Sequence, residues 1–113
     1  MKVHGIVNCN TVKAARAWLD TRRLAYEFVD FKKTPPDAAQ LERWCKTFGW
    51  ETVLNRRGTT WRLLPLAAQA KVKDQSSAIA VMLDKPSAVK RPVIEAGKTT
   101  LIGFDEAEYG KKL

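Results

Sequence analysis

Cys9 stands where a short apolar run ends and a basic helical pattern begins, in the stretch HGIVNCNTVKAARAWL over residues 4–19. If a strand ends before this cysteine and a helix follows it, the thiol lies where free N–H groups and the positive end of the helix dipole meet. This position lowers the pKa of a thiol, and the charge of Lys13, one helical turn further on, would act in the same direction. Cys9 is therefore either a nucleophile or a cysteine packed at the end of the strand, and the local sequence favours neither.

The second cysteine, Cys45, lies on one apolar helical face together with Leu41, Trp44 and Phe48. This pattern favours packing in the core over chemistry for Cys45. The stretch CNTV has Val12 where a C-x-x-C motif has its second cysteine. A mixed disulfide at Cys9 therefore needs an external thiol, from glutathione or a second protein, unless Cys45 lies close enough to serve.

Arginines occur in two further motifs. NRRGTTWR has Arg56 and Arg57 in a loop with a glycine, and KRPV has Arg91 before Pro92 at the start of a strand. A guanidinium is a planar fork suited to carboxylates and oxyanions, so arginines that converge near a thiolate would form an anion-binding nucleophilic site. Each arginine can equally be a solvent-exposed side chain. The residues alone favour a trans Arg91–Pro92 bond, because most X-Pro bonds are trans.

The residues around Cys9 predict a strand, a helix and a second strand. Residues 3–7 form a short apolar run, and residues 25–31 combine aromatic and β-branched side chains, as strands do. From residue 11 to about residue 23 the apolar positions recur every three or four residues, which predicts a helix. A strand-helix-strand of this length indicates a parallel pair with a right-handed crossover.

A helical stretch of roughly forty residues follows, without a strand of its own. Asp37 with Gln40 predicts a capping box at the start of a helix that Gly49 ends, and Asp74 predicts the cap of a later helix. NRRGTTW is expected to be a loop, and short helical turns are expected on either side of Pro65. Two strands, RPVIEA and KTTLIGF, are predicted to form an antiparallel hairpin with its turn at Ala96-Gly97, before a short C-terminal helix.

The length of 113 residues predicts one domain, residues 1–113, with a helical insertion at about 36–88. Neither a membrane span of ~18 apolar residues nor a secretory leader is recognised, so a cytoplasmic protein without membrane association is expected. Two cysteines and one histidine, His4, predict neither a disulfide framework nor a metal site. A net charge of +8 indicates an anionic partner or Lys-rich helix faces. Nucleic acid is not expected, because the basic residues are spread out without interleaved aromatics.

The strand-Cys-helix arrangement, NRRGTTWR and KRPVIEAGKTTLIGF, in this order, resemble the arsenate reductase/Spx family of thioredoxin-like proteins, and in particular its YffB-type branch. The resemblance covers essentially the whole chain. It implies an α/β thioredoxin-like fold with a mixed four-stranded sheet and a helical insertion. It also implies a cis bond at Pro92, in place of the trans default.

The resemblance implies a set of site residues as well. In the reductases of this family a cysteine attacks arsenate, arginines hold the oxyanion, and glutathione with glutaredoxin completes the cycle. By position, Cys9 would be the nucleophile, and Lys13 stands where those reductases have an arginine. Arg56 or Arg57 matches their loop arginine, and Arg91 matches the arginine before the cis-proline.

Three departures from the family pattern narrow the chemistry. Gly5 stands where the reductases have a histidine, while His4 is one residue off and is expected on the other side of the strand. A further arginine of the reductases falls at about Gly103. Each lost charge-assisted contact would cost about 1.5–3 kcal/mol, which makes arsenate a doubtful substrate. Val12 removes the C-x-x-C switch of Spx-type regulators.

The sequence thus predicts a glutathione-dependent thiol–disulfide reductase with one nucleophilic cysteine. Its expected site residues are Cys9 as nucleophile, Lys13 as thiolate stabiliser, the cis-proline Pro92, and Arg56, Arg57 and Arg91 as the groups that bind the glutathione carboxylate. No bound cofactor is expected. The expected partners of a monomeric protein are glutathione or a thiol/disulfide substrate, and glutaredoxin. Two alternatives remain: true arsenate reduction, and a Spx-type regulatory protein that contacts RNA polymerase.

Overall fold

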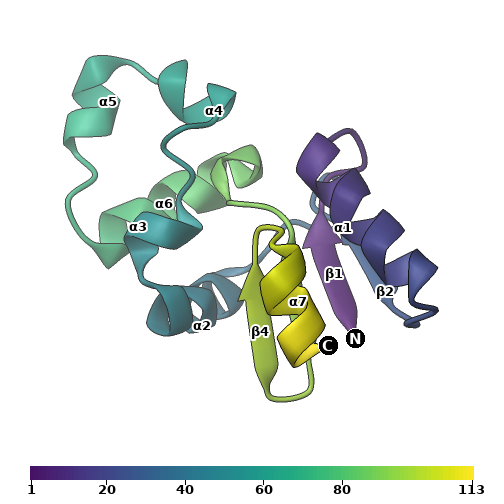
Figure 1. The fold of residues 1–113 in the computed structure, drawn as a ribbon. Helices are drawn as coiled ribbons and strands as arrows, with labels where there is room; N and C mark the ends of the chain where they lie inside the picture. The colour runs from purple at the N-terminus through teal and green to yellow at the C-terminus, as the bar shows by residue number, and fades with distance from the viewer. The chain divides into compact units, whose positions relative to one another are not determined.

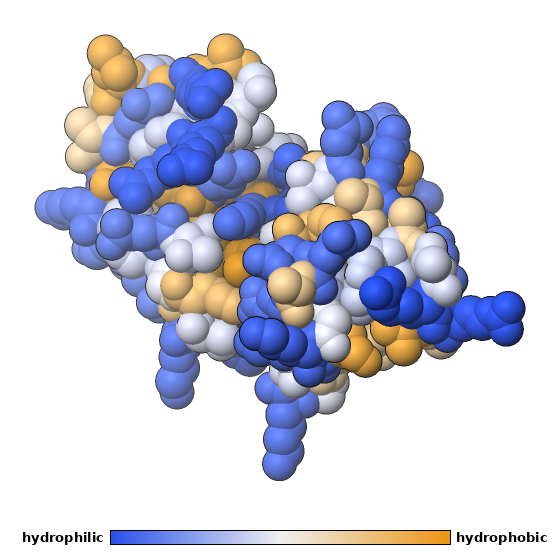
Figure 2. All heavy atoms as spheres, viewed as in Figure 1, coloured by the Kyte–Doolittle hydropathy of each residue, from blue (hydrophilic) through white to orange (hydrophobic).

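The computed structural model describes residues 1–113 and divides the chain into two compact units (Figure 1). Unit 1 comprises Met1–Thr34 and Arg91–Leu113, and unit 2 comprises Pro35–Lys90. The residues of the predicted helical insertion lie in unit 2. None of the helices in either unit is both long enough and apolar enough to cross a membrane. The face drawn in Figure 2 shows mostly hydrophilic residues, with smaller hydrophobic areas among them.

Unit 1 contains a mixed four-stranded sheet with the strand order β2-β1-β3-β4. Its strands and helices are β1 (Lys2–Gly5), α1 (Asn10–Thr21), β2 (Glu27–Asp30), β3 (Val93–Ala96), β4 (Thr99–Ile102) and α7 (Glu106–Lys112). Strand β1 pairs in parallel with β2 and antiparallel with β3, and β3 pairs antiparallel with β4. This arrangement confirms the predicted thioredoxin-like fold class with its parallel pair and its antiparallel hairpin.

The core of unit 1 lies on one face of this sheet, under α1 and α7. Val3 on β1 pairs with Ile94 on β3, and Ile94 pairs with Leu101 on β4, so the three side chains lie side by side on this face. They pack with side chains of the two helices, namely Ala15, Trp18, Leu19 and Tyr109. The rings of Trp18 and Tyr109 meet edge to face with centroids 5.5 Å apart. The apolar positions that predicted this helix therefore form its buried face.

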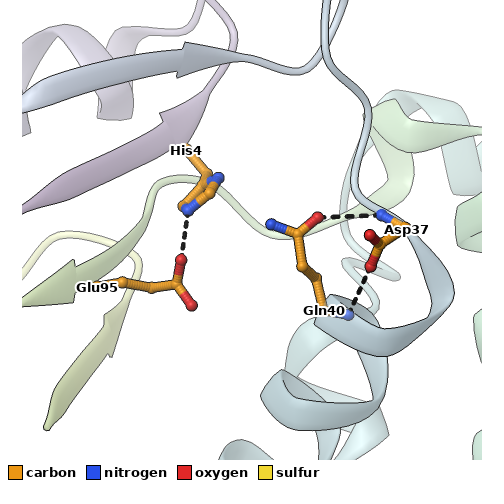
Figure 3. Close-up of polar contacts among 4 residues, drawn as sticks. All are labelled: His4, Asp37, Gln40 and Glu95. Carbon is orange, nitrogen blue, oxygen red and sulfur yellow. Dashed lines mark hydrogen bonds and ion pairs between the residues drawn. The ribbon is translucent and has the colours of Figure 1, made fainter.

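The opposite face of the sheet holds His4. Side chains alternate along a strand, so His4 points away from the face that Val3 and Gly5 share, as expected. The residue is 2% exposed, and its Nε2 lies 2.6 Å from Oε1 of Glu95 on β3 (Figure 3). The lone histidine is thus a buried, hydrogen-bonded residue of the sheet.

Unit 2 is helical, and its short elements are separated by turns. They are α2 (Ala38–Phe48), α3 (Trp50–Val53), α4 (Thr59–Arg62), α5 (Leu66–Ala70), α6 (Gln75–Asp84) and the 3-10 helix η1 (Pro86–Ala88). The predicted capping box begins α2: the Gln40 N–H donates to the Asp37 carboxylate, and the Asp37 N–H donates to the Gln40 side chain (Figure 3). Asp74 caps α6 in the same way with Ser77. Both caps confirm sequence predictions.

Two local predictions were wrong. The hairpin turn lies at Gly97-Lys98 and not at Ala96-Gly97, because Ala96 still pairs with Thr99. A two-residue turn then begins at Gly97, whose positive φ of 61° suits it. Within NRRGTTW only the first part is a turn, since α4 begins at Thr59 directly after Gly58.

Candidate functional site

Cys9 is the N-cap residue of α1, at the junction that follows β1. Its backbone is extended, with φ −124° and ψ 122°, and its carbonyl accepts the first helical hydrogen bond from the Lys13 N–H at 2.9 Å. The thiol is half-buried. The side chain therefore stands at the end of the helix where N–H groups have no helical acceptor.

The surroundings of Cys9 favour its thiolate. Partial burial by itself would raise the pKa of the thiol, but three groups outweigh it: the N–H of Val12, the guanidinium of Arg91 through a hydrogen bond and its charge, and the N–H of Thr11. The pKa of Cys9 is therefore lowered from its ordinary value. A cysteine with these neighbours can act as a nucleophile or as a thiolate leaving group.

Arg91 reaches this site from the start of β3. The Arg91–Pro92 peptide bond is cis, Arg91 is half-buried and Pro92 is buried. The Pro92 carbonyl accepts a hydrogen bond of 2.8 Å from the Gly103 N–H. This bond ties the residue that follows Arg91 to the end of β4 and so helps to hold the segment that carries the guanidinium.

Lys13 differs from Arg91. Its side chain is exposed, and the groups that lower the pKa of Cys9 do not include it. The role assigned to Lys13 stays a prediction. The sequence indicated two cations for this site, Lys13 one helical turn along α1 and Arg91 before β3, and the cation beside the thiol is Arg91.

Gly103, the second departure from the reductase pattern, has a φ of 74°. This left-handed conformation favours glycine over any residue with a Cβ. The backbone at this position therefore disfavours the arginine that the reductases have there.

Cys45 lies in unit 2, on the buried face of α2. It is 3% exposed, and burial raises the pKa of its thiol. Both properties are those of an inert core cysteine, which is what the apolar face of α2 predicted.

Arg56 and Arg57 also lie in unit 2, in the turn before α4. Arg56 forms an ion pair and a cation–π contact: its Nη2 lies 3.4 Å from the Glu51 carboxylate, and its guanidinium lies 5.5 Å from the centre of the Trp50 ring. Arg57 has no carboxylate partner among the ion pairs. Of the two arginines, Arg57 is therefore the one whose guanidinium is available to a ligand. The convergence of this turn with Cys9 stays a prediction.

Comparison with known proteins identifies the family. The family model of the ArsC family matches residues 4–112. The solved structure of a protein named YFFB has a TM-score of 0.93 and is 47% identical, covering 97% of this chain and 96% of that one. An uncharacterized protein of Haemophilus influenzae is 36% identical over 107 residues, which are 95% of this chain and 93% of that protein. The global transcriptional regulator Spx of Streptococcus agalactiae is 27% identical over 103 residues, or 89% of this chain and 74% of the regulator.

These matches agree with the fold and with the resemblance seen in the motifs. The family model covers the end of β1, the helix that Cys9 caps, the arginine turn and the Arg91–Pro92 segment. The chain therefore belongs to the ArsC family.

Proposed function

We propose that this chain is a glutathione-dependent thiol–disulfide reductase with Cys9 as its only nucleophile. The lowered pKa of Cys9 carries the proposal, because the thiolate and not the thiol attacks a disulfide sulfur. Cys9 is half-buried, whereas Cys45 is buried. The Arg91 guanidinium supports the same role, since it stabilises negative charge on the sulfur both before attack and when Cys9 leaves.

The proposed reaction consists of thiol–disulfide exchanges. The Cys9 thiolate attacks one sulfur of a substrate disulfide, so that a Cys9–substrate disulfide forms and the other half leaves as a thiolate that takes up a proton. A glutathione thiolate attacks the Cys9 sulfur, releases the second half of the substrate and leaves glutathione bound to Cys9. A second glutathione, or glutaredoxin, then frees the Cys9 thiolate. With glutathione alone, one substrate disulfide is reduced to two thiols and two glutathione molecules become one oxidised glutathione.

An external thiol is required because the chain supplies no suitable second cysteine. Val12 is fully buried where a C-x-x-C motif has its resolving cysteine. Cys45 is buried and its pKa is raised, so it is a poor attacking thiol. Glutathione is the small thiol that fits this requirement.

Mass spectrometry after incubation with oxidised glutathione tests the proposal. The wild-type protein and Cys45→Ser are expected to gain one glutathione on Cys9, and Cys9→Ser is expected to gain none. Reduced glutathione should then remove the adduct. An adduct on Cys45 alone, or no adduct at all, would refute the proposed nucleophile.

Arsenate reduction is the second candidate, and membership of the ArsC family favours it. Cys9 and Arg91 would then attack and hold the oxyanion. Gly5 and Gly103 argue against it, because they stand where the reductases have a histidine and an arginine. The Spx relative supports a regulatory role less strongly, since Val12 removes the second cysteine of the Spx switch.

A further inference from the structure

A polar pocket of about 570 Å³ opens on unit 2 beside the turn that holds Arg56 and Arg57. Its polar lining consists of Glu51, Thr52, Asn55, Arg56, Arg57 and Lys90. Small-molecule sites in proteins typically have volumes of roughly 300–1,000 Å³, so a ligand the size of a tripeptide fits. The pocket was not predicted from the sequence, because nothing in the sequence connects Glu51 with Lys90, the first residue of KRPV.

Backbone pairing builds the pocket from two distant segments. Leu54 and Val89 form an antiparallel bridge. On either side of it the Asn55 N–H donates to the Ala88 carbonyl and the Lys90 N–H donates to the Val53 carbonyl, both at 2.8 Å. The bridge therefore brings Lys90 beside the arginine turn.

The turn itself is held by the Asn55 side chain. Its Oδ1 accepts a hydrogen bond of 3.2 Å from the Arg57 N–H. The backbone that carries Arg57 is thus fixed by local hydrogen bonds, as in other Asx turns. When a ligand binds to the Arg57 guanidinium, the backbone is already in place and only the Arg57 side chain has to become ordered.

The charges in this pocket are divided between a pair and two unpaired cations. Glu51 and Arg56 form the pair, at 3.4 Å, with side chains that are 67% and 46% exposed. Arg57 and Lys90 take part in no ion pair. The pocket therefore presents two separate cations and one exposed carboxylate whose existing partner is weakly held in solvent.

We propose that this pocket binds glutathione, with Arg57 and Lys90 taking its two carboxylates and Glu51 taking its ammonium group. The inference rests on the proposed function, from which glutathione is taken as the ligand. Glutathione carries two carboxylates at opposite ends of a short peptide and one ammonium beside the first. An arginine fork and a lysine point charge are both established carboxylate partners. Thr52 and Asn55 supply neutral polar groups for the peptide bonds.

Glu51 is the feature that distinguishes glutathione from a simple oxyanion. A carboxylate in an anion pocket repels phosphate or arsenate, because like charges at close range disfavour binding. The same carboxylate attracts a ligand that carries an ammonium next to a carboxylate. Glu51 therefore predicts selectivity for a zwitterionic peptide end.

Titration with S-methylglutathione tests the site, because the blocked thiol separates binding from the chemistry of Cys9. NMR shifts are expected at the pocket lining, and Arg57→Gln and Lys90→Gln should each raise Kd about tenfold, the effect of one charge-assisted contact. Lys46→Gln, which removes an exposed cation from α2, is the matched control and should bind as wild type does. Glu51→Gln should weaken binding of S-methylglutathione but not of its N-acetylated form, which lacks the ammonium and carries only negative charge.

Three results would overturn the assignment: no shifts at the lining, wild-type affinity in both Arg57→Gln and Lys90→Gln, or inorganic phosphate that binds as tightly as S-methylglutathione. Cystamine, a small disulfide without carboxylates, separates this failure from failure of the proposed function. If Cys9 forms a mixed disulfide with cystamine in every variant while the pocket binds nothing, the nucleophile stands and the pocket does not. If the pocket binds but Cys9 forms no mixed disulfide, the proposed reduction fails and the binding site stands.

Discussion

A Cβ atom added to Gly5 would lie 2.8 Å from Cγ2 of Val12. Val12 is fully buried in the first turn of α1, and its branched side chain has few alternative rotamers in a helix. The end of β1 and the start of α1 therefore pack so closely that a side chain at position 5 requires Val12 to shift. The two residues that depart from the reductase histidine and the Spx cysteine are thus in contact with each other.

Gly5→Ala is expected to lower the free energy of unfolding by about 1–3 kcal/mol, because the new methyl group overlaps Val12. Val12→Ala removes that overlap at the cost of a cavity. The double variant should therefore cost less than the sum of the two single variants, and a double-mutant cycle from urea unfolding measures the difference.

Gly110→Ala in α7 is the control for this cycle, since nothing lies within 4 Å of the added Cβ. It should be neutral or stabilise the protein by up to ~1 kcal/mol, because alanine favours a helix over glycine. Strictly additive costs for Gly5→Ala and Val12→Ala would contradict the proposed contact.

Arg91→Gln is expected to raise the pKa of Cys9, because it removes both the charge and the charged donor beside the thiolate. The rate of iodoacetamide alkylation follows the thiolate fraction, so a lowered pKa moves the rise in rate to lower pH. In a Cys45→Ser background the wild-type midpoint should lie below the ordinary ~8.5, and Arg91→Gln should move it to higher pH.

Two further variants, measured by the same dependence of alkylation rate on pH, test which cation lowers the pKa of Cys9 and whether its charge is sufficient. Arg91→Lys should retain part of the shift, since it keeps the charge but loses the fork. Lys13→Gln should change the midpoint less than Arg91→Gln does, because the Lys13 side chain is exposed. A profile unaffected by Arg91→Gln would remove the electrostatic basis of the site.

The elements that the sequence predicted well are those whose signals are local. The caps at Asp37 and Asp74 involve residues three positions apart, and the buried stripe of α1 repeats at helical spacing. The turn after Ala96 was misread because its position depends on which residues of the two strands pair. Moving the turn by one residue changes which residues pair, but the residue types around the turn are almost the same in both cases.

In the candidate site, too, local sequence signals were sufficient for some residues and not for others. Cys9 at the start of α1 followed from the strand and helix patterns. KRPV indicated Arg91 as a candidate that could equally be solvent-exposed, and only the family resemblance assigned it to the site of Cys9. Glu51 and Lys90 were missed because the Leu54–Val89 bridge brings together segments that no sequence period connects. Contacts between distant segments are the part of this molecule that required a structure.

Cys45 should react with iodoacetamide only when the protein unfolds. It is 3% exposed, and burial raises its pKa, so both access and thiolate fraction are low. In native protein at neutral pH, peptide mass spectrometry should find the label on Cys9 alone, and in denaturant on both cysteines. Equal native labelling of the two would show that α2 opens readily and would make Cys45 available as a resolving thiol.

Arsenate turnover is expected to be very low in the presence of glutathione and glutaredoxin. Two groups of the reductase anion site are absent, and each charge-assisted contact contributes about 1.5–3 kcal/mol. Gly103→Arg should not restore activity, since a φ of 74° disfavours a side chain by about 1–2 kcal/mol. Reduction of hydroxyethyl disulfide by glutathione without glutaredoxin, followed as oxidation of NADPH by added glutathione reductase and compared with Cys9→Ser, shows that the preparation is active. Arsenate turnover comparable to disulfide turnover would instead make this chain a true arsenate reductase, and Cys9→Ser would then have to abolish it.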